Sequence, residues 1–213
     1  MNSIDIVYLL TVLLVILFSM TIHEAMHAYA SYYLGDDTAK LLGRLSFNPI
    51  KHIDPVLTIL MPIMLAIAGL PIFGGARPVP FNPTKLRFGE WGMVIVALAG
   101  PISNLLIAFL SFGVLVFLSR GAYPDFSIRL FSTLVSVNLG FFVFNMLPIP
   151  PLDGSRVLYV LAPDFFRTIM DKIERFGIIF VFIIVFVSGS LIGTIMLSAI
   201  NFFLNIFNII FNV

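Results

Sequence analysis

His23, Glu24 and His27 have the residue types and the spacing of a zinc-dependent hydrolase site. Residues i and i+4 of a helix lie on one face, so both imidazoles can bind one metal ion while Glu24 lies beside it as a general base. Between Ile6 and Tyr33 these three side chains are the only ones that are charged or titrate near neutral pH. The alternative is that these histidines pack inside the protein without binding a metal ion. Burial in hydrocarbon is costly without a partner such as a divalent cation, so the sequence favours a metal site.

Asp153 is the best candidate for a third ligand, because catalytic zinc commonly has three protein ligands and an open position. Three prolines in residues 148–152 keep the preceding chain extended, and Gly154 permits a turn that aims the carboxylate back at the helices. An Asp before a Gly is also common in ordinary turns, so this local pattern leaves both interpretations open.

The composition indicates a protein that lies in a lipid bilayer. Of 213 residues, 60% are hydrophobic and 11% charged, and the mean hydropathy is +1.08. The net charge of +1 gives no reason to expect a nucleic-acid partner, and the lack of Cys excludes thiolate zinc sites and disulfides. The first apolar stretch lacks the preceding basic region and the small-residue cleavage site of a signal peptide, so we expect a retained span. We expect an all-α polytopic membrane protein with a single domain, residues 1–213.

Five apolar stretches divide the chain: Ile6–Tyr33 and residues 56–73, 91–118, 128–147 and 176–211. The first, third and fourth are long enough to cross a hydrocarbon core of about 30 Å as helices. The second contains Pro62, Gly69 and Pro71, which favour a short or re-entrant helix. The fifth has Ser-Gly-Ser at 188–190 and is either one tilted helix or two. We therefore expect four to six transmembrane or re-entrant helices.

Smaller features complete the predicted architecture. Residues 39–54 and 74–83 are mixed in character and rich in proline at their ends, and we expect a small β-hairpin region near the active site. Gly189 and Gly193 form a small-xxx-small face, for which packing against another helix is the default interpretation and a homo-oligomer is a further one.

The distribution of positive charge tests the topology. If residues 56–73 enter and leave by one side, His27 and Asp153 emerge on the same side of the membrane. That side then carries ten of the twelve Lys and Arg residues, and the far side only Arg120 and Arg129. If residues 56–73 instead crossed the membrane, the motif side would carry five Lys and Arg residues and the far side seven. The first ratio is expected when the motif faces the cytoplasm of a cell membrane, which supports Asp153 as the third ligand.

Several blocks together resemble the site-2 protease family of intramembrane zinc metalloproteases (peptidase family M50), in its compact prokaryotic form without PDZ or CBS domain. The blocks are residues 23–27, 48–55, 75–80, 99–104 and 152–154. The resemblance implies regulated intramembrane proteolysis, in which peptide bonds within or near transmembrane helices of membrane-anchored substrates are hydrolysed. It also implies one Zn²⁺ per chain, held by His23, His27 and Asp153, with Glu24 as the base.

Asn145 lies eight residues before Asp153 and matches the family position thought to stabilise the oxyanion. The alternative is an interhelical hydrogen bond, with Asn138 as one possible neighbour. His52 is interpreted as a residue that fixes the turn at 48–55 or as a partner of the site. Residues 74–79 are a candidate edge to which an opened substrate could add as a strand, or else a cover over the site.

Two other functions fit the His-Glu motif less well. Membrane zincins of the prenyl-protein or housekeeping type use a glutamate from a later helix as third ligand, and the only later glutamates here are Glu90 and Glu174, outside a suitable helical motif. A metal transporter or scaffold would need polar residues along a path through the membrane, whereas this chain has one compact cluster near one face.

Overall fold

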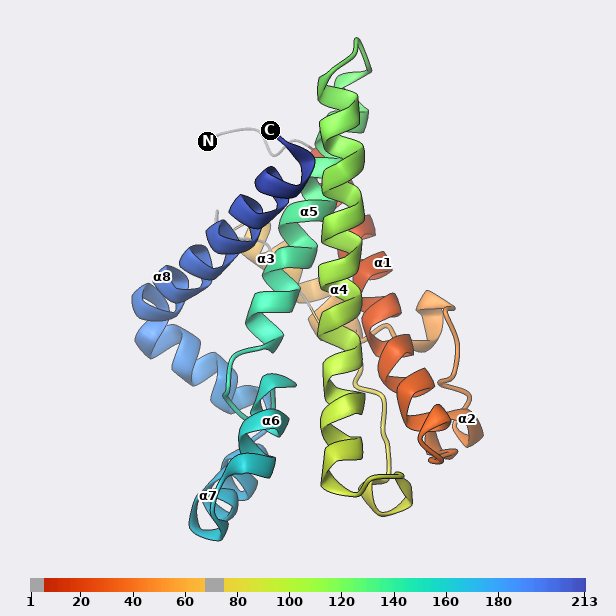
Figure 1. The fold of residues 1–213 in the computed structure, drawn as a ribbon, viewed down its shortest axis with the longest axis vertical. Coiled ribbons are helices and arrows are strands. Elements are labelled where there is room, and N and C mark those ends of the chain that lie inside the picture. Colours follow the sequence, from red (N-terminus) through yellow and green to blue (C-terminus); the bar gives the residue numbers. More distant parts are fainter. Residues whose placement is uncertain (1–5, 68–74) are drawn as a thin grey trace.

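A computed structural model describes residues 6–67 and 75–213, and its described part is built from helices (Figure 1). The long ones are α1 (Ile6–Tyr33), α4 (Glu90–Ser119), α5 (Asp125–Asn145) and α8 (Ile178–Phe211). The short ones are α2 (Thr38–Leu41), α3 (Met61–Ile67), α6 (Gly154–Leu161) and α7 (Asp164–Glu174). Single turns η1 (Pro49–Lys51) and η3 (Pro83–Lys85) and a π-helical segment η2 (Pro55–Leu60) complete the order.

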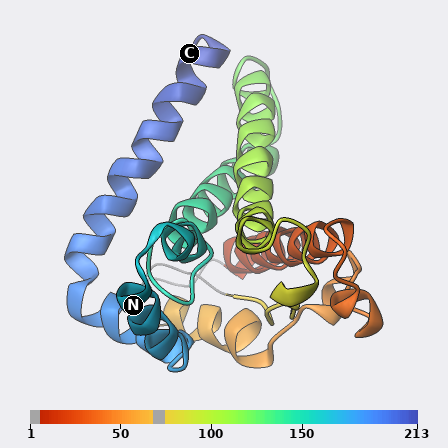
Figure 2. The same ribbon diagram turned by 60° about the horizontal axis from the view of Figure 1, so that its bottom comes forward.

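Four helices are long and apolar enough to cross a membrane: α1, α4, α5 and the Gly189–Phe211 part of α8. The all-α polytopic prediction is therefore confirmed. The last apolar stretch forms one continuous helix, α8, that changes direction partway along (Figures 1 and 2).

α1, α4 and α5 form the central bundle. One apolar cluster joins α1 to α5 and contains Val12, Ile16, Met20 and Phe141, with Ala76 packed against it. α8 meets the bundle only toward its C-terminal end and leans away from it elsewhere (Figure 2). At that end the rings of Phe207 and Phe211 make edge-to-face and tilted contacts with those of Phe109 and Phe112 of α4. A cavity lined by residues of α1, α5 and α8 lies between these helices.

The described residues on either side of the gap at 68–74 show where the two ends of the second apolar stretch lie. The amide of Gly75 donates to the carbonyl oxygen of Leu57 at 3.0 Å, and Thr58 Oγ1 donates to the carbonyl oxygen of Gly75 at 2.6 Å. A helix that crossed the bilayer would separate its ends by about 30 Å. Residue 75 instead contacts residues 57 and 58, so the two ends of the stretch lie together, as a re-entrant segment requires.

The expected β-hairpin is wrong, since the described residues contain no strand. Residues 75–82, which we call the strap, are extended but form isolated hydrogen bonds rather than a ladder. Gly75 pairs with Leu57, and the amide of Arg77 donates to the carbonyl oxygen of His52 at 2.9 Å. Pro78 and Pro80 lack the amide hydrogens that a ladder needs, which explains the difference.

Candidate metal centre

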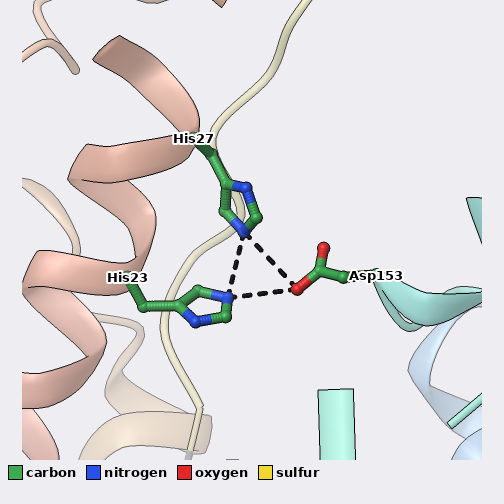
Figure 3. Close-up of side chains that lie close together, drawn as sticks. All are labelled: His23, His27 and Asp153. Atoms are coloured by element: carbon green, nitrogen blue, oxygen red, sulfur yellow. Dashed lines mark hydrogen bonds and ion pairs between the residues drawn. The ribbon is translucent and has the colours of Figure 1, made fainter. Parts of the chain in front are cut away.

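His23, His27 and Asp153 converge on one point, with α1 supplying the two imidazoles and the chain before α6 supplying the carboxylate (Figure 3). The Nε2 atoms of the two histidines are 3.0 Å apart. Asp153 Oδ2 lies 3.2 Å from His23 Nε2 and 3.5 Å from His27 Nε2. The i, i+4 spacing produces the histidine pair locally, whereas Asp153 reaches it across more than a hundred residues of chain.

Gly154 lets the chain bring Asp153 to the histidines. A Cβ atom at this position would lie 2.3 Å from the carbonyl oxygen of Met146, so only glycine permits this close approach between the start of α6 and the end of α5. The Asp153 carboxylate faces the two imidazoles, so a cation between the three groups could be bound by all of them.

A chain of buried hydrogen bonds fixes the orientation of His23. The carbonyl oxygen of Leu134 can only accept, so the Asn138 group that contacts it at 2.9 Å is the NH₂. Asn138 Oδ1 then accepts from Asn104 Nδ2 at 2.9 Å, and Asn104 Oδ1 accepts from His23 Nδ1 at 2.6 Å. His23 consequently carries its proton on Nδ1 and directs the lone pair of Nε2 at the centre.

His27 has the same tautomer, since its Nδ1 donates to the carbonyl oxygen of Val96 at 2.8 Å. Two Nε2 lone pairs thus face each other and the Asp153 carboxylate, an arrangement that a cation between them stabilises. Ligands about 2.0–2.1 Å from a tetrahedral zinc ion lie about 3.3 Å apart, close to the three separations found here. Two imidazoles and one carboxylate, with a further position left open, suit a catalytic zinc site.

Gly100 of α4 leaves room for the ion. A Cβ atom there would lie 2.4 Å from His27 Nε2 and 2.7 Å from His23 Nε2, the two atoms that would bind it. The absence of a side chain at this position therefore keeps the centre of the three ligands free.

Gly100→Ala is expected to lose most of its bound zinc, because the added methyl group displaces the imidazoles or takes the place of the ion. The measurement is zinc per chain by elemental analysis of the purified protein. Gly140→Ala is the matched control, because a Cβ at this glycine of α5 meets nothing within 4 Å. Equal zinc in both variants would show that Gly100 does not shape the site.

Glu24 lies beside the three ligands and is held by the strap. Its side chain is buried, and its Oε2 accepts a hydrogen bond from the amide of Val79 at 2.8 Å. It is not part of the converging set of ligands. The other carboxylate oxygen, Oε1, is therefore left for chemistry.

Asn145 and His52 have separate places. Asn145 ends α5, and its Nδ2 donates to the carbonyl oxygen of Phe141 in its own helix at 3.0 Å. The alternative bond to Asn138 is wrong, since Asn138 pairs with Asn104 and Ser19.

His52 is buried and its Nε2 donates to the carbonyl oxygen of Ser46 at 2.7 Å, so it fixes the turn rather than contacting the ligands. Burial lowers the pKa of His52, and the charge of Arg44 lowers it further.

A cavity of about 1220 Å³ opens from the metal centre, and Asn145, Glu24 and all three ligands line it. Its walls run along one face of α1 from His27 to Tyr8, which is about 28 Å at the rise of a helix. Small or apolar residues of α5 and α8 form the opposite walls. Gly189 and Gly193 are among them, and a Cβ at either would meet nothing within 4 Å, so the expected packing of these glycines against another helix is wrong within the described chain.

The two later glutamates do not reach the centre. Glu174 pairs with Arg156, and Glu90 pairs with Arg167 at 2.6 Å. A glutamate third ligand is thereby ruled out. Sequence reasoning missed the hydrogen-bond chain through Asn104, Asn138 and Ser19, although a buried Asn in an apolar span is a signal for such a partner.

Comparison with known proteins agrees with this geometry. The model of the family described as Peptidase family M50 matches residues 119–189, which include Asp153. YwhC of Bacillus subtilis is 42% identical over 200 residues, which are 90% of this chain and 86% of YwhC. Rip2 of Mycolicibacterium smegmatis is 34% identical over 67% of this chain and 53% of Rip2. Both relatives carry the name "putative zinc metalloprotease". No solved structure matches the chain.

Proposed function

Because the chain belongs to the site-2 protease family (peptidase family M50) and is a zinc metalloprotease, we propose that it hydrolyses peptide bonds within or near transmembrane helices of membrane-anchored proteins. The observation that carries this proposal is the cavity that leads from the ligands along α1 and α5. Its length is close to the thickness of a hydrocarbon core, and its walls are mostly apolar. A transmembrane segment has the length and surface to occupy it.

The chemistry follows from the positions of the side chains. We propose that His23, His27 and Asp153 hold the zinc ion, which when bound supplies Lewis-acid activation of water and of the scissile carbonyl group. Glu24 takes a proton from the attacking water at Oε1, while Oε2 stays on the amide of Val79. The same carboxyl group then gives the proton to the leaving amine. The apolar walls of the cavity limit competing access of bulk water.

The decisive experiment compares membrane proteins in cells that contain the wild type with those in cells that contain Glu24→Gln. A substrate should accumulate uncut in the second population and should be cut within or near a transmembrane segment. Accumulation confined to soluble proteins would contradict the proposal.

Asn145 is proposed to donate from Nδ2 to the developing oxyanion. Asn145→Ala should then lower turnover by about 10²–10³, the usual loss for one such donor, with zinc content unchanged. Its present bond to Phe141 lies within α5, so thermal stability should stay near that of the wild type. Unchanged turnover in the folded, zinc-loaded variant would remove Asn145 from the mechanism.

The strap is proposed as the docking edge for an opened substrate. Both backbone groups of Gly75 and the amide of Arg77 pair with residues 52–58, whereas the amide and carbonyl groups of Ala76 have no partner among the described residues. Ala76 also lines the cavity, so these two groups can pair with a substrate strand. Gly74, the first residue of the predicted edge, lies outside the described chain.

Ala76→Pro removes one donor from this edge and should slow cleavage of a helical substrate about fivefold, the effect of one hydrogen bond. A substrate already opened by helix-breaking residues should be less affected, because it depends less on pairing to be unfolded. Ala76→Ser keeps the amide and serves as the control. An equal loss for both substrates would identify the strap as a cover only.

The remaining features stay proposals. We place the metal centre toward the cytoplasm, because the return of residue 75 to residue 57 supports the arrangement with ten positive residues on that side. Labelling of a Lys85→Cys variant from outside the cell would contradict it. We also propose a single membrane-embedded domain. A homo-oligomer through Gly189 and Gly193 remains a prediction that crosslinking can test.

A further inference from the structure

Arg44 is a buried cation whose partners are backbone carbonyl groups. Its exposed fraction is 8%, although it lies in the loop after α2 rather than in a span. Nη2 donates to the carbonyl oxygen of Arg77 and, at 3.4 Å, to that of Pro78. Its Nε is buried without a hydrogen-bond partner, and the described residues offer it no carboxylate within ion-pair distance. Burial of an arginine without an anion is costly, so its contacts require an explanation.

Those contacts converge on the peptide group that binds Glu24. The carbonyl oxygen of Pro78 and the amide of Val79 belong to one peptide unit. Arg44 approaches its oxygen, and Glu24 Oε2 accepts from its N–H at 2.8 Å. Arg44 also holds the preceding carbonyl group, that of Arg77, while the amide of Arg77 is fixed on His52. The peptide unit that meets Glu24 is thus held from both sides.

We infer that Arg44 is a positioning residue for Glu24, acting through the peptide group between Pro78 and Val79. Its cation fixes the plane of that peptide group and polarises it, so that the N–H becomes a stronger donor to the carboxylate. The carboxylate is then held with Oε1 free and turned toward the metal centre. Arginine suits this role because Nη2 of its planar, delocalised cation carries two N–H groups, one for each of two successive carbonyl oxygens.

The inference rests on the proposed role of Glu24 as the base, and it is tested with a probe that needs no substrate. Acetohydroxamate chelates zinc through two oxygens and transfers its proton to a neighbouring base, so its affinity reports where that base lies. The experiment measures its dissociation constant on the zinc-loaded full chain in four forms: wild type, Arg44→Gln, Glu24→Gln and the double variant. Zinc per chain is measured on the same samples.

Arg44→Gln is expected to raise the dissociation constant of acetohydroxamate about tenfold, the effect of losing one charge-assisted hydrogen bond, with zinc content unchanged. In the Glu24→Gln background the same change should have little effect, because the carboxylate that Arg44 positions is gone. Arg44→Lys should give an intermediate affinity. Lys40→Gln is the matched control, since it removes an exposed cation of α2 that contacts Tyr32 and should leave the affinity unchanged.

An equal loss in both backgrounds would overturn the inference, because Arg44 would then act on the structure as a whole. No loss in either background would overturn it as well. If Arg44→Gln fails to fold or to hold zinc, the comparison of single and double variants is made with Arg44→Lys, and the same outcomes apply. A Glu24→Gln protein that binds acetohydroxamate as well as the wild type and still cleaves would instead refute the proposed role of Glu24.

Discussion

Glu24→Gln is expected to keep its zinc and to lose cleavage almost completely. The carboxylate is not one of the converging ligands, so the metal content should stay near one ion per chain. Glutamine can still accept the hydrogen bond from Val79 through its amide oxygen, so the strap should stay in place. It cannot take a proton from water, and loss of a positioned base lowers rates by about 10²–10⁴.

Turnover of a membrane substrate and zinc per chain are the two measurements. Glu90→Gln is a suitable control, because Glu90 is half-exposed and pairs with Arg167 far from the ligands. Cleavage by Glu24→Gln at a rate within tenfold of the wild type would show that another group acts as the base.

Asp153→Ala is expected to lose its zinc and all zinc-dependent activity. The variant leaves two imidazoles, one fewer than the three protein ligands that a catalytic zinc site commonly needs. It also removes the carboxylate whose charge offsets that of the ion. His23→Ala and His27→Ala should behave alike, because each removes one of three donors that lie within 4.8 Å of one another.

Elemental analysis after exchange into metal-free buffer gives the zinc content. Asp164→Ala, which removes an exposed carboxylate at the start of α7, should retain the ion. Full occupancy in Asp153→Ala would refute the assignment of the third ligand, while loss of zinc from both aspartate variants would indicate general damage to the fold.

Sequence patterns predicted the parts of this protein that depend on neighbouring residues. The histidine pair follows from the helical repeat, which places positions 23 and 27 on one face of α1. The spans follow from apolar length, while Pro62, Gly69 and Pro71 predicted a short or re-entrant helix, of which the structure describes Met61–Ile67. The position of Asp153 beside the histidines was predictable because the number of spans decides on which side of the membrane its chain segment emerges, and the charge count constrains that number.

The predicted hairpin failed for a different reason. Alternation and proline positions in residues 75–82 indicate an extended chain, but they do not say where its hydrogen bonds go. The structure directs them to a carboxylate, an arginine and the turn at 52–57 instead of to a second strand. An extended backbone with several prolines cannot form a ladder, so these partners take its place.

Only the tertiary structure decided how the site is supported. Asn104 meets His23 across 81 residues, and Val79 meets Glu24 across 55. Gly100 lies against the ligands because α4 is rotated about its own axis to face α1 at that residue. Composition and periodicity show which face of a helix is polar, but the rotation and depth at which two helices pack depend on the summed contacts of all their side chains. The sequence by itself therefore predicted the proposed ligands and the proposed base, and helix packing determined the atoms that orient them.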